Sequence, residues 1–324
     1  MEKALLFLVV ILFILGFSLL VPQVQRNIVK LVVVTGRLEV AQEAPQVRYI
    51  YMEDIQLPTS PTGIPAFDGA EDSTQPLDLK ATVYDENGDC NGNFTWYICT
   101  NDTLESGPCS STNYDYKVSD TSADQQWGGP QNNLYCNFSA SFNLEYFKRC
   151  GIATIYGVAT DVQGNTNSST VYWKYNAIQV LSFYPYPYES VIDFGLIAAG
   201  AWKNTTVKTL KNTGNVQFNA LWNATDFYNA TYGTIDVTGN NYFGLDKDTS
   251  PGNEGWIENP PTQITYPTTP IKRCGNFGCT VDEDGSAPND AMFDLYWKLY
   301  IPLGVNPAIY TNNIETLAEQ VTQC

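Results

Sequence analysis

Two acidic turns carry the residue types and spacing best suited to hold a cation. In VYDENGDCNGN, Asp85, Asn87 and Asp89 offer oxygen ligands at alternate positions around a glycine. Carboxylate and amide oxygens are ligands that Ca²⁺ prefers. The spacing departs from that of an EF-hand loop, whose glycine follows the third ligand. The stretch therefore indicates either a Ca²⁺ site or an ordinary Asn-Gly hairpin turn.

The second acidic turn is DEDGSAPND, with Asp282, Glu283, Asp284 and Asp290. It allows the same two interpretations, a Ca²⁺ site or a solvated acidic loop. No other cofactor is indicated.

Histidine is absent from the chain. Its absence excludes Ser-His-Asp and Cys-His nucleophile systems and every His-ligated zinc site. Paired carboxylates could still act in glycoside hydrolysis, but they need a cleft that holds two acids about 5–10 Å apart. The acids here stand in turns and loops without an apolar setting, so the sequence predicts a protein that is not an enzyme.

Eight cysteines follow the apolar N-terminus, and none forms a CxxC pair. An even number in an exported chain predicts disulfides. Cys274 and Cys279, in CGNFGC, can close a small loop by themselves. The pairing of the others stays open, as does the alternative that some are free thiols; they are Cys90, Cys99, Cys109, Cys136, Cys150 and Cys324.

The N-terminus predicts a membrane anchor. An uninterrupted apolar run of 18 residues, 4–21, ends at Pro22, and no A-x-A-like cleavage site follows it. That length suits a short bilayer span better than the apolar core of a signal peptide. We therefore expect an uncleaved signal anchor rather than a cleaved signal, with the remaining chain outside the cell.

A second apolar stretch, QVQRNIVKLVVVTGRLEV, follows the anchor without a partner in the local sequence. One interpretation is an ordinary first strand or a stalk helix. The other is an assembly surface that packs on the next subunit, as the hydrophobic N-terminal helix does in pilin-like filaments, or a strand donated to a neighbour's sheet edge. The residues of this surface are Ile28, Leu31, Val32, Val33 and Val34.

From residue 47 onward, alternating apolar and polar residues predict strands. LYCNFSASFNL and PLDLKATVY each place their apolar residues on one face, and the FYPYPY stretch marks a boundary because proline lacks the ladder donor. The fold class is all-β: two tandem antiparallel β-sandwich (Ig-like) domains behind an N-terminal hydrophobic helix. The expected parts are 1–44, 45–177 and 178–324, the last with an insertion of surface loops at 226–291.

Charge and sequons indicate the surroundings of the chain. A net charge of −17 makes nucleic acid an unsuitable partner. Seven Asn-x-Ser/Thr sequons predict N-glycans on an extracellular surface, unless they merely reflect an Asn- and Thr-rich composition. The sequons are at Asn93, Asn101, Asn137, Asn167, Asn204, Asn223 and Asn229.

Three groups of motifs resemble known extracellular modules. VATDVQGNTNSSTVYW resembles the closing strands of immunoglobulin-like and PKD-like modules, where A-x-D-x-x-G-N forms the last hairpin. IDFGLIAAG, LKNTGNVQF and WKLYIPLGVNPAIYTNNIE resemble the β-sandwich domain of archaeal secreted and cell-surface proteins. The part that contains the FG pair, the glycine that follows it and the NTGN turn is also similar to the sandwich of TasA-like and archaeal bundling-pilus subunits. Those subunits are single domains with a cleaved signal, unlike this chain.

These observations predict a non-enzymatic structural protein of the cell surface that is disulfide-bonded and glycosylated. We expect it to assemble with copies of itself, through its N-terminal segment, into a filament or envelope. Residues 4–21 would contact the membrane. The alternative is a membrane-anchored adhesin. That protein would bind glycans or cells through the loops at 226–291 and the tyrosines Tyr184, Tyr186 and Tyr188.

Overall fold

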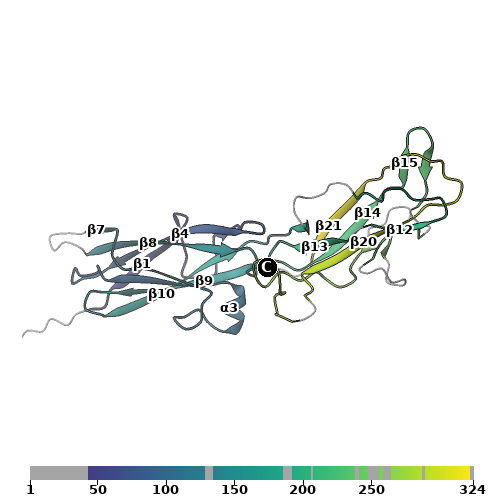
Figure 1. The fold of residues 1–324 in the computed structure, drawn as a ribbon. Coiled ribbons are helices and arrows are strands. Elements are labelled where there is room, and N and C mark those ends of the chain that lie inside the picture. Colours follow the sequence, from purple (N-terminus) through teal and green to yellow (C-terminus); the bar gives the residue numbers. More distant parts are fainter. Residues whose placement is uncertain are drawn as a thin grey trace, which may run out of the picture. The chain divides into compact units, whose positions relative to one another are not determined.

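The protein is described from a computed structural model, which covers residues 43–127, 134–184, 192–205, 207–237, 241–246, 255–257, 264–286 and 289–321. The part from Ala44 onward forms one compact unit. It is all-β, with several antiparallel sheets and almost no helix (Figure 1); one short helix, α3 (Asn101–Ser106), lies within the described ranges. The predicted anchor and assembly residues lie outside them. Within the same ranges, no helix has the length and apolar character that crossing a bilayer requires.

Period-2 alternation produces the two longest paired strands. In β4 (Thr74–Tyr84), Leu77, Leu79, Ala81 and Val83 are buried, while the intervening residues are exposed or half-buried. β8 (Tyr135–Glu145) pairs antiparallel with β4 along its whole length, from Thr74 opposite Glu145 to Tyr84 opposite Tyr135. Successive strand residues point to opposite faces, so this register places both apolar faces on one side of the sheet.

Two five-stranded sheets form the first sheet pair. Their orders are β2-β1-β4-β8-β7 and β3-β10-β9-β5-β6. Both contribute to one core, in which Phe94 of β5 and Phe138 of β8 have ring centroids 5.9 Å apart. The remaining bounds are β1 Gln46–Met52, β2 Ile55–Gln56, β3 Ala66–Phe67, β5 Asn93–Cys99, β6 Tyr116–Asp120, β7 Gln125–Trp127, β9 Gly151–Thr160 and β10 Thr166–Tyr175.

The second sheet pair lies after residue 178. One sheet has the order β11-β13-β20-β17-β18, with β12 also pairing with β20, and the facing sheet has the order β19-β14-β21. Trp222 and Trp297 from the two sheets meet edge-to-face in a second core, 5.4 Å apart. The bounds are β11 Leu181–Tyr184, β12 Trp202–Asn204, β13 Lys208–Asn212, β14 Phe218–Ala224, β15 Phe227–Asn229, β16 Gly233–Ile235, β17 Phe243–Asp246, β18 Gly255–Trp256, β19 Ile264–Thr265, β20 Met292–Tyr300 and β21 Ile314–Gln320.

The stretch 226–291 differs from the surface loops expected of it. All four residues of β17 are buried, and β17 pairs with β20 inside the second sheet pair. Val237, Ile257 and Ile271 also enter the second core. These segments are too short for period-2 alternation to show, and a strand buried on both faces does not alternate at all.

Three disulfides join described cysteines. They link Cys90 to Cys136, Cys99 to Cys109, and Cys274 to Cys279. The first connects the loop before β5 to β8, which belongs to the other sheet of the first pair. A small third core beside the Cys274–Cys279 bridge also contains Tyr146 and Phe147.

Candidate functional site

Three aspartates from separate strand ends meet in the first sheet pair. Asp85 directly follows β4, Asp89 stands in the loop that leads to β5, and Asp161 directly follows β9. β4 belongs to one sheet of the pair, and β5 and β9 to the other. The group, called the Asp trio below, therefore joins the two sheets.

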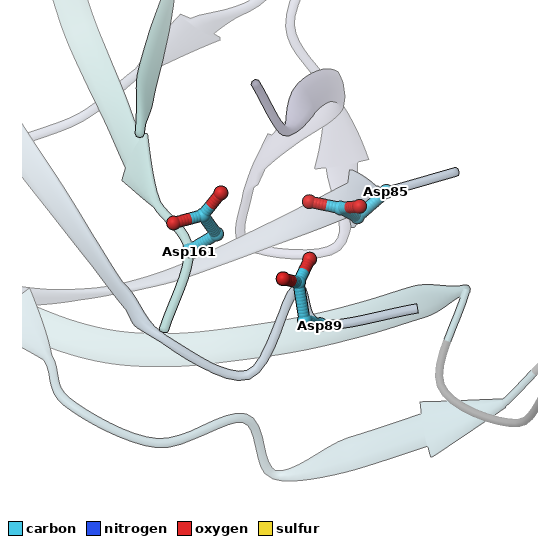
Figure 2. A group of neighbouring side chains, drawn as sticks. All are labelled: Asp85, Asp89 and Asp161. Carbon is cyan, nitrogen blue, oxygen red and sulfur yellow. The ribbon is translucent and has the colours of Figure 1, made fainter. Parts of the chain in front are cut away.

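The carboxylates of the Asp trio turn toward one another (Figure 2). One oxygen from each residue lies within 4.8 Å of one oxygen from each of the others. Asp85 and Asp161 are almost inaccessible to solvent, with 1% and 3% of their surface exposed. Like charges at this separation and depth repel strongly, because water does not screen them.

Backbone donors hold two of the three carboxylates in place. Asp85 Oδ1 accepts the N–H of Asn87 at 2.8 Å. Asp161 Oδ1 accepts the N–H groups of Gln163 and Asn165, each at 2.8 Å, and its Oδ2 accepts the side-chain amide of Asn165 at 2.7 Å. These bonds arise because short Asp side chains bind backbone groups two to four residues ahead in tight turns.

Two buried oxygens of the trio have no donor among the described residues. Among the described residues, neither Asp85 Oδ2 nor Asp89 Oδ1 has a hydrogen-bond partner, although both atoms are buried. No lysine or arginine in the described part of the chain forms an ion pair with the trio. Burial, with the adjacent Asp89 and Asp161 charges, raises the pKa of Asp85 to about 6. Carboxylate oxygens gathered in this way are the ligand type that could hold a metal ion.

The trio differs from the expected ligand set in one member. Asn87 is exposed and gives Asp85 its backbone N–H, whereas Asp161 supplies a carboxylate that the sequence analysis did not include. Asp161 is the aspartate of ATDVQGN, which forms the turn between β9 and β10. A signal for it existed, since that turn has an Asp and a Gly-Asn spaced as in a hairpin, but nothing in the sequence placed it beside Asp85.

Three acids of the second acidic turn, Asp282, Glu283 and Asp284, pair with cations. Lys272 Nζ lies 2.9 Å from Asp284 and 3.4 Å from Asp282. Arg273 Nε lies 2.9 Å from Glu283, and its guanidinium also binds Asp102. The hydrogen bonds of Asp284 to Ser286 and Lys272 hold its pKa well below the usual range.

The second sheet pair contains a groove of about 1410 Å³, lined by many apolar side chains and also by polar ones such as Asp193, Asn306 and Glu315. Both sheets line it, through Phe183 of β11, Trp297 of β20 and Ile314 of β21. β21 stands at the edge of its sheet, paired with β14 on one side. Leu196 and Ile309 stand on the rim of the groove with 98% and 84% of their surfaces exposed.

The predicted sequon asparagines occupy different environments. Asn93 and Asn167 are exposed, on β5 and β10. Asn101 and Asn229 use their amide groups in hydrogen bonds to the Cys150 and Ile309 carbonyls. Asn137 accepts the hydroxyl of Thr82. Asn204 and Asn223 are half-buried on β12 and β14.

The predicted aromatic binding surface is mostly outside the described residues. Tyr186 and Tyr188 lie in an omitted segment, while Tyr184 belongs to β11. Trp297 is fully buried, as are Leu295 and Leu299, which alternate with it on β20.

No protein-family model matches the chain, and no curated protein matches it by sequence. Solved structures show only a distant likeness. One similar structure is the pre-assembly complex of the CsuC chaperone and the CsuE tip adhesion subunit, from archaic chaperone-usher Csu pili of Acinetobacter baumannii. Its TM-score is 0.31 at 9% sequence identity, and the match covers 78% of this chain and 96% of that one. The C-terminal domain of the Streptococcus pyogenes antigen I/II-family protein AspA has a TM-score of 0.27 and 11% identity, covering 85% and 95%. At these scores the likeness carries no argument about function.

Proposed function

We propose that this chain is a non-enzymatic structural protein of the cell surface that assembles with copies of itself. Its two sheet pairs act as tandem immunoglobulin-like sandwiches, at 45–177 and 178–324. The groove of the second sheet pair is the observation that carries the proposal. A filled core is the norm in a β-sandwich, and a groove that opens beside an edge strand is suited to receive a strand.

The occupant we propose is the segment IVKLVVV, residues 28–34, of a second copy. Seven residues of strand extend about 23 Å at the usual rise per residue. An added strand would run along the side of β21 that pairs with no other described strand, displacing the Gln179 side chain from the Ala318 carbonyl, and would place apolar side chains against Phe183 and Ile314, in the mode of β-strand addition.

The size of the groove favours a polypeptide over a small molecule. Pockets for small ligands are usually about 300–1,000 Å³, and this groove is about 1410 Å³. Its rim carries the almost fully exposed side chains of Leu196 and Ile309. Assembly would bury them.

The disulfides support an extracellular position. Structural disulfides persist in oxidising compartments, and three join described cysteines. The acidic charge suits solubility there. Asn93 and Asn167 are the sequon residues we expect to carry glycans most readily, because both are exposed. Residues 4–21 would hold the chain in the membrane before or after assembly.

The test is assembly of the full chain, examined by negative-stain electron microscopy and sedimentation. The wild type should form regular fibres or sheets. The double variant Leu31→Asp/Val33→Asp should remain dispersed, because burying charges against the apolar side chains of the groove is costly. Ile309→Asp should also prevent assembly, by changing the receiving side. Ile152→Asp is the matched control: Ile152 is an exposed isoleucine on β9, remote in sequence from the groove residues.

Unchanged assembly of both groove and segment variants would overturn the proposal. Isolated particles of the wild type that bind a glycan array or cells, with the same binding by a chain lacking residues 1–44, would favour the adhesin instead.

A further inference from the structure

We propose that Asp85, Asp89 and Asp161 bind one Ca²⁺ ion, which fastens the two sheets of the first sheet pair to each other. Nothing in this inference depends on self-assembly, since it rests on a different part of the chain.

The convergence of oxygens without donors is the first argument. Buried polar atoms in proteins almost always have a hydrogen-bond partner, and buried charges are paired or bind metals. Asp85 is 99% buried, yet its Oδ2 has no hydrogen-bond partner among the described residues, and neither has the buried Asp89 Oδ1. Figure 2 shows the three side chains gathered together. A cation at the centre would satisfy both atoms.

The spacing of the oxygens fits the size of Ca²⁺. Ca²⁺ binds oxygen at about 2.3–2.6 Å, so two oxygens on opposite sides of one ion lie up to about 5 Å apart. The three carboxylate oxygens lie within 4.8 Å of one another. One ion can therefore reach all three without moving the backbone.

The ligand chemistry selects a hard cation. All three side chains offer carboxylate oxygen, and neither histidine nor a thiolate takes part, which disfavours zinc and copper. Mg²⁺ demands shorter bonds and near-ideal octahedral geometry, and it keeps its waters more tightly, whereas Ca²⁺ accepts irregular sets of six to eight oxygens. Asp161 is held by three donors and Asp85 by one, so the carboxylates are oriented before the ion arrives.

The position of the trio explains what the ion would do. Asp85 ends β4 in one sheet, and Asp161 ends β9 in the other. Asp89 is followed directly by Cys90, whose disulfide to Cys136 returns to the first sheet. The backbone of Val162 also donates to the Asp89 carbonyl at 3.4 Å. A bound ion and the disulfide would thus close the same end of the sheet pair.

The experiment uses the full chain in mild detergent after removal of metal with EDTA. CaCl₂ is titrated by isothermal calorimetry, and thermal unfolding is followed with and without it. Extracellular Ca²⁺ modules bind with Kd of roughly 10⁻⁴–10⁻³ M, and we expect a value in that range, one ion per chain, and a melting temperature that rises with CaCl₂. MgCl₂ should bind at least about tenfold more weakly, because its waters are harder to remove.

Two variants distinguish a metal site from a structural acid. Asp89→Asn should weaken Ca²⁺ binding at least about tenfold, the lower end of the effect seen on altering even outer groups of metal sites. Asp85→Asn should lose the Ca²⁺ response, yet in EDTA its melting temperature should equal or exceed that of the wild type. The substitution removes a buried charge that has no partner, whereas loss of a carboxylate with a purely structural role would lower that temperature.

Asp284→Asn is the matched control, because it changes an acid of the second acidic turn that already pairs with Lys272. Its Ca²⁺ response should equal that of the wild type. The proposal is overturned if the wild type shows no heat and no thermal shift up to about 10 mM CaCl₂, tenfold above the weakest extracellular sites. It is also overturned if Asp85→Asn and Asp89→Asn respond as the wild type does, or if Mg²⁺ binds as tightly as Ca²⁺.

Discussion

Two acidic turns of similar composition differ in whether their carboxylates pair with cations of the chain. In DENGD, the carboxylates of Asp85 and Asp89 meet a third, Asp161, and no cation of the described chain pairs with them. In DEDGS, Asp282 and Asp284 meet Lys272, and Glu283 meets Arg273. What surrounds an acidic turn, rather than its own residues, decides whether it has room for a metal ion.

The pKa directions express the same contrast. Burial beside other carboxylates raises the pKa of Asp85 to about 6, whereas hydrogen bonds to Ser286 and Lys272 lower that of Asp284. Asp115 extends the comparison to another buried acid. Its burial opposes ionisation, but hydrogen bonds from Lys148 and Thr103 outweigh that effect and lower its pKa. A buried carboxylate thus keeps its charge where the chain supplies a cation.

Removing Arg273, one of the two cations that pair with the second turn, should cause the largest loss of stability. In Arg273→Met, the half-buried Glu283 and Asp102 lose the counter-charge that the buried Arg273 supplies to both. Breaking a buried ion pair from one side costs about 3–5 kcal/mol, which chemical denaturation would measure. Arg149→Met, which removes a more exposed pair with Glu105, should cost about 1 kcal/mol or less. Equal losses in the two variants would show that burial does not govern this network.

The disulfides beside the two turns should differ in how much they stabilise the fold. Cys90–Cys136 closes a loop with a sequence separation of 46, and Cys274–Cys279 one of 5. The loop-entropy relation gives about 4 kcal/mol for the first and about 2 kcal/mol for the second at 25 °C. Paired Cys→Ser substitutions, compared by urea unfolding, check both values. Only loss of Cys90–Cys136 should also weaken Ca²⁺ binding, because Asp89 adjoins Cys90; equal Ca²⁺ affinity in both variants would contradict the link.

Metal removal should affect the first turn alone. At a Ca²⁺ concentration 100 times the Kd, binding to the native state adds about 2.7 kcal/mol of stability. EDTA should remove that gain from the wild type and from Asp284→Asn, and should leave Asp85→Asn, which has lost the Ca²⁺ response, unchanged. Denaturant midpoints measured with Ca²⁺ and with EDTA provide the comparison. If the denaturant midpoint of the wild type is the same with Ca²⁺ and with EDTA, the first turn binds no ion and does not differ from the second turn in this respect.

The sequence predicts the strands of this protein better than it predicts the sites. β4 and β8 bury the faces that alternation assigns to them, since each has one apolar face and a long run. β17 escapes prediction because all its side chains are buried and its four residues show no period. Asp85 and Asp89 are recognisable as candidate ligands from their local spacing. Asp161 is not, because its place beside them depends on the pairing of β5 with β9, a contact between distant segments.

The smallest loss of stability is expected at Asp115, an acid of the first sheet pair that does have a cation, Lys148, as its partner. Asp115→Asn removes an ion pair with Lys148 whose atoms lie 2.7 Å apart, while the amide oxygen can still accept from Thr100. We expect a loss of about 1.5 kcal/mol at pH 7, the lower value for a hydrogen bond to a charged group. Because the folded pKa of Asp115 is depressed, its contribution is full above the unfolded pKa of about 3.9 and disappears as the pH falls through the folded value. The wild type and the variant should therefore converge in stability below about pH 4, which unfolding at a series of pH values would measure. A difference that stays constant down to pH 2 would mean that the carboxylate charge of Asp115 contributes nothing.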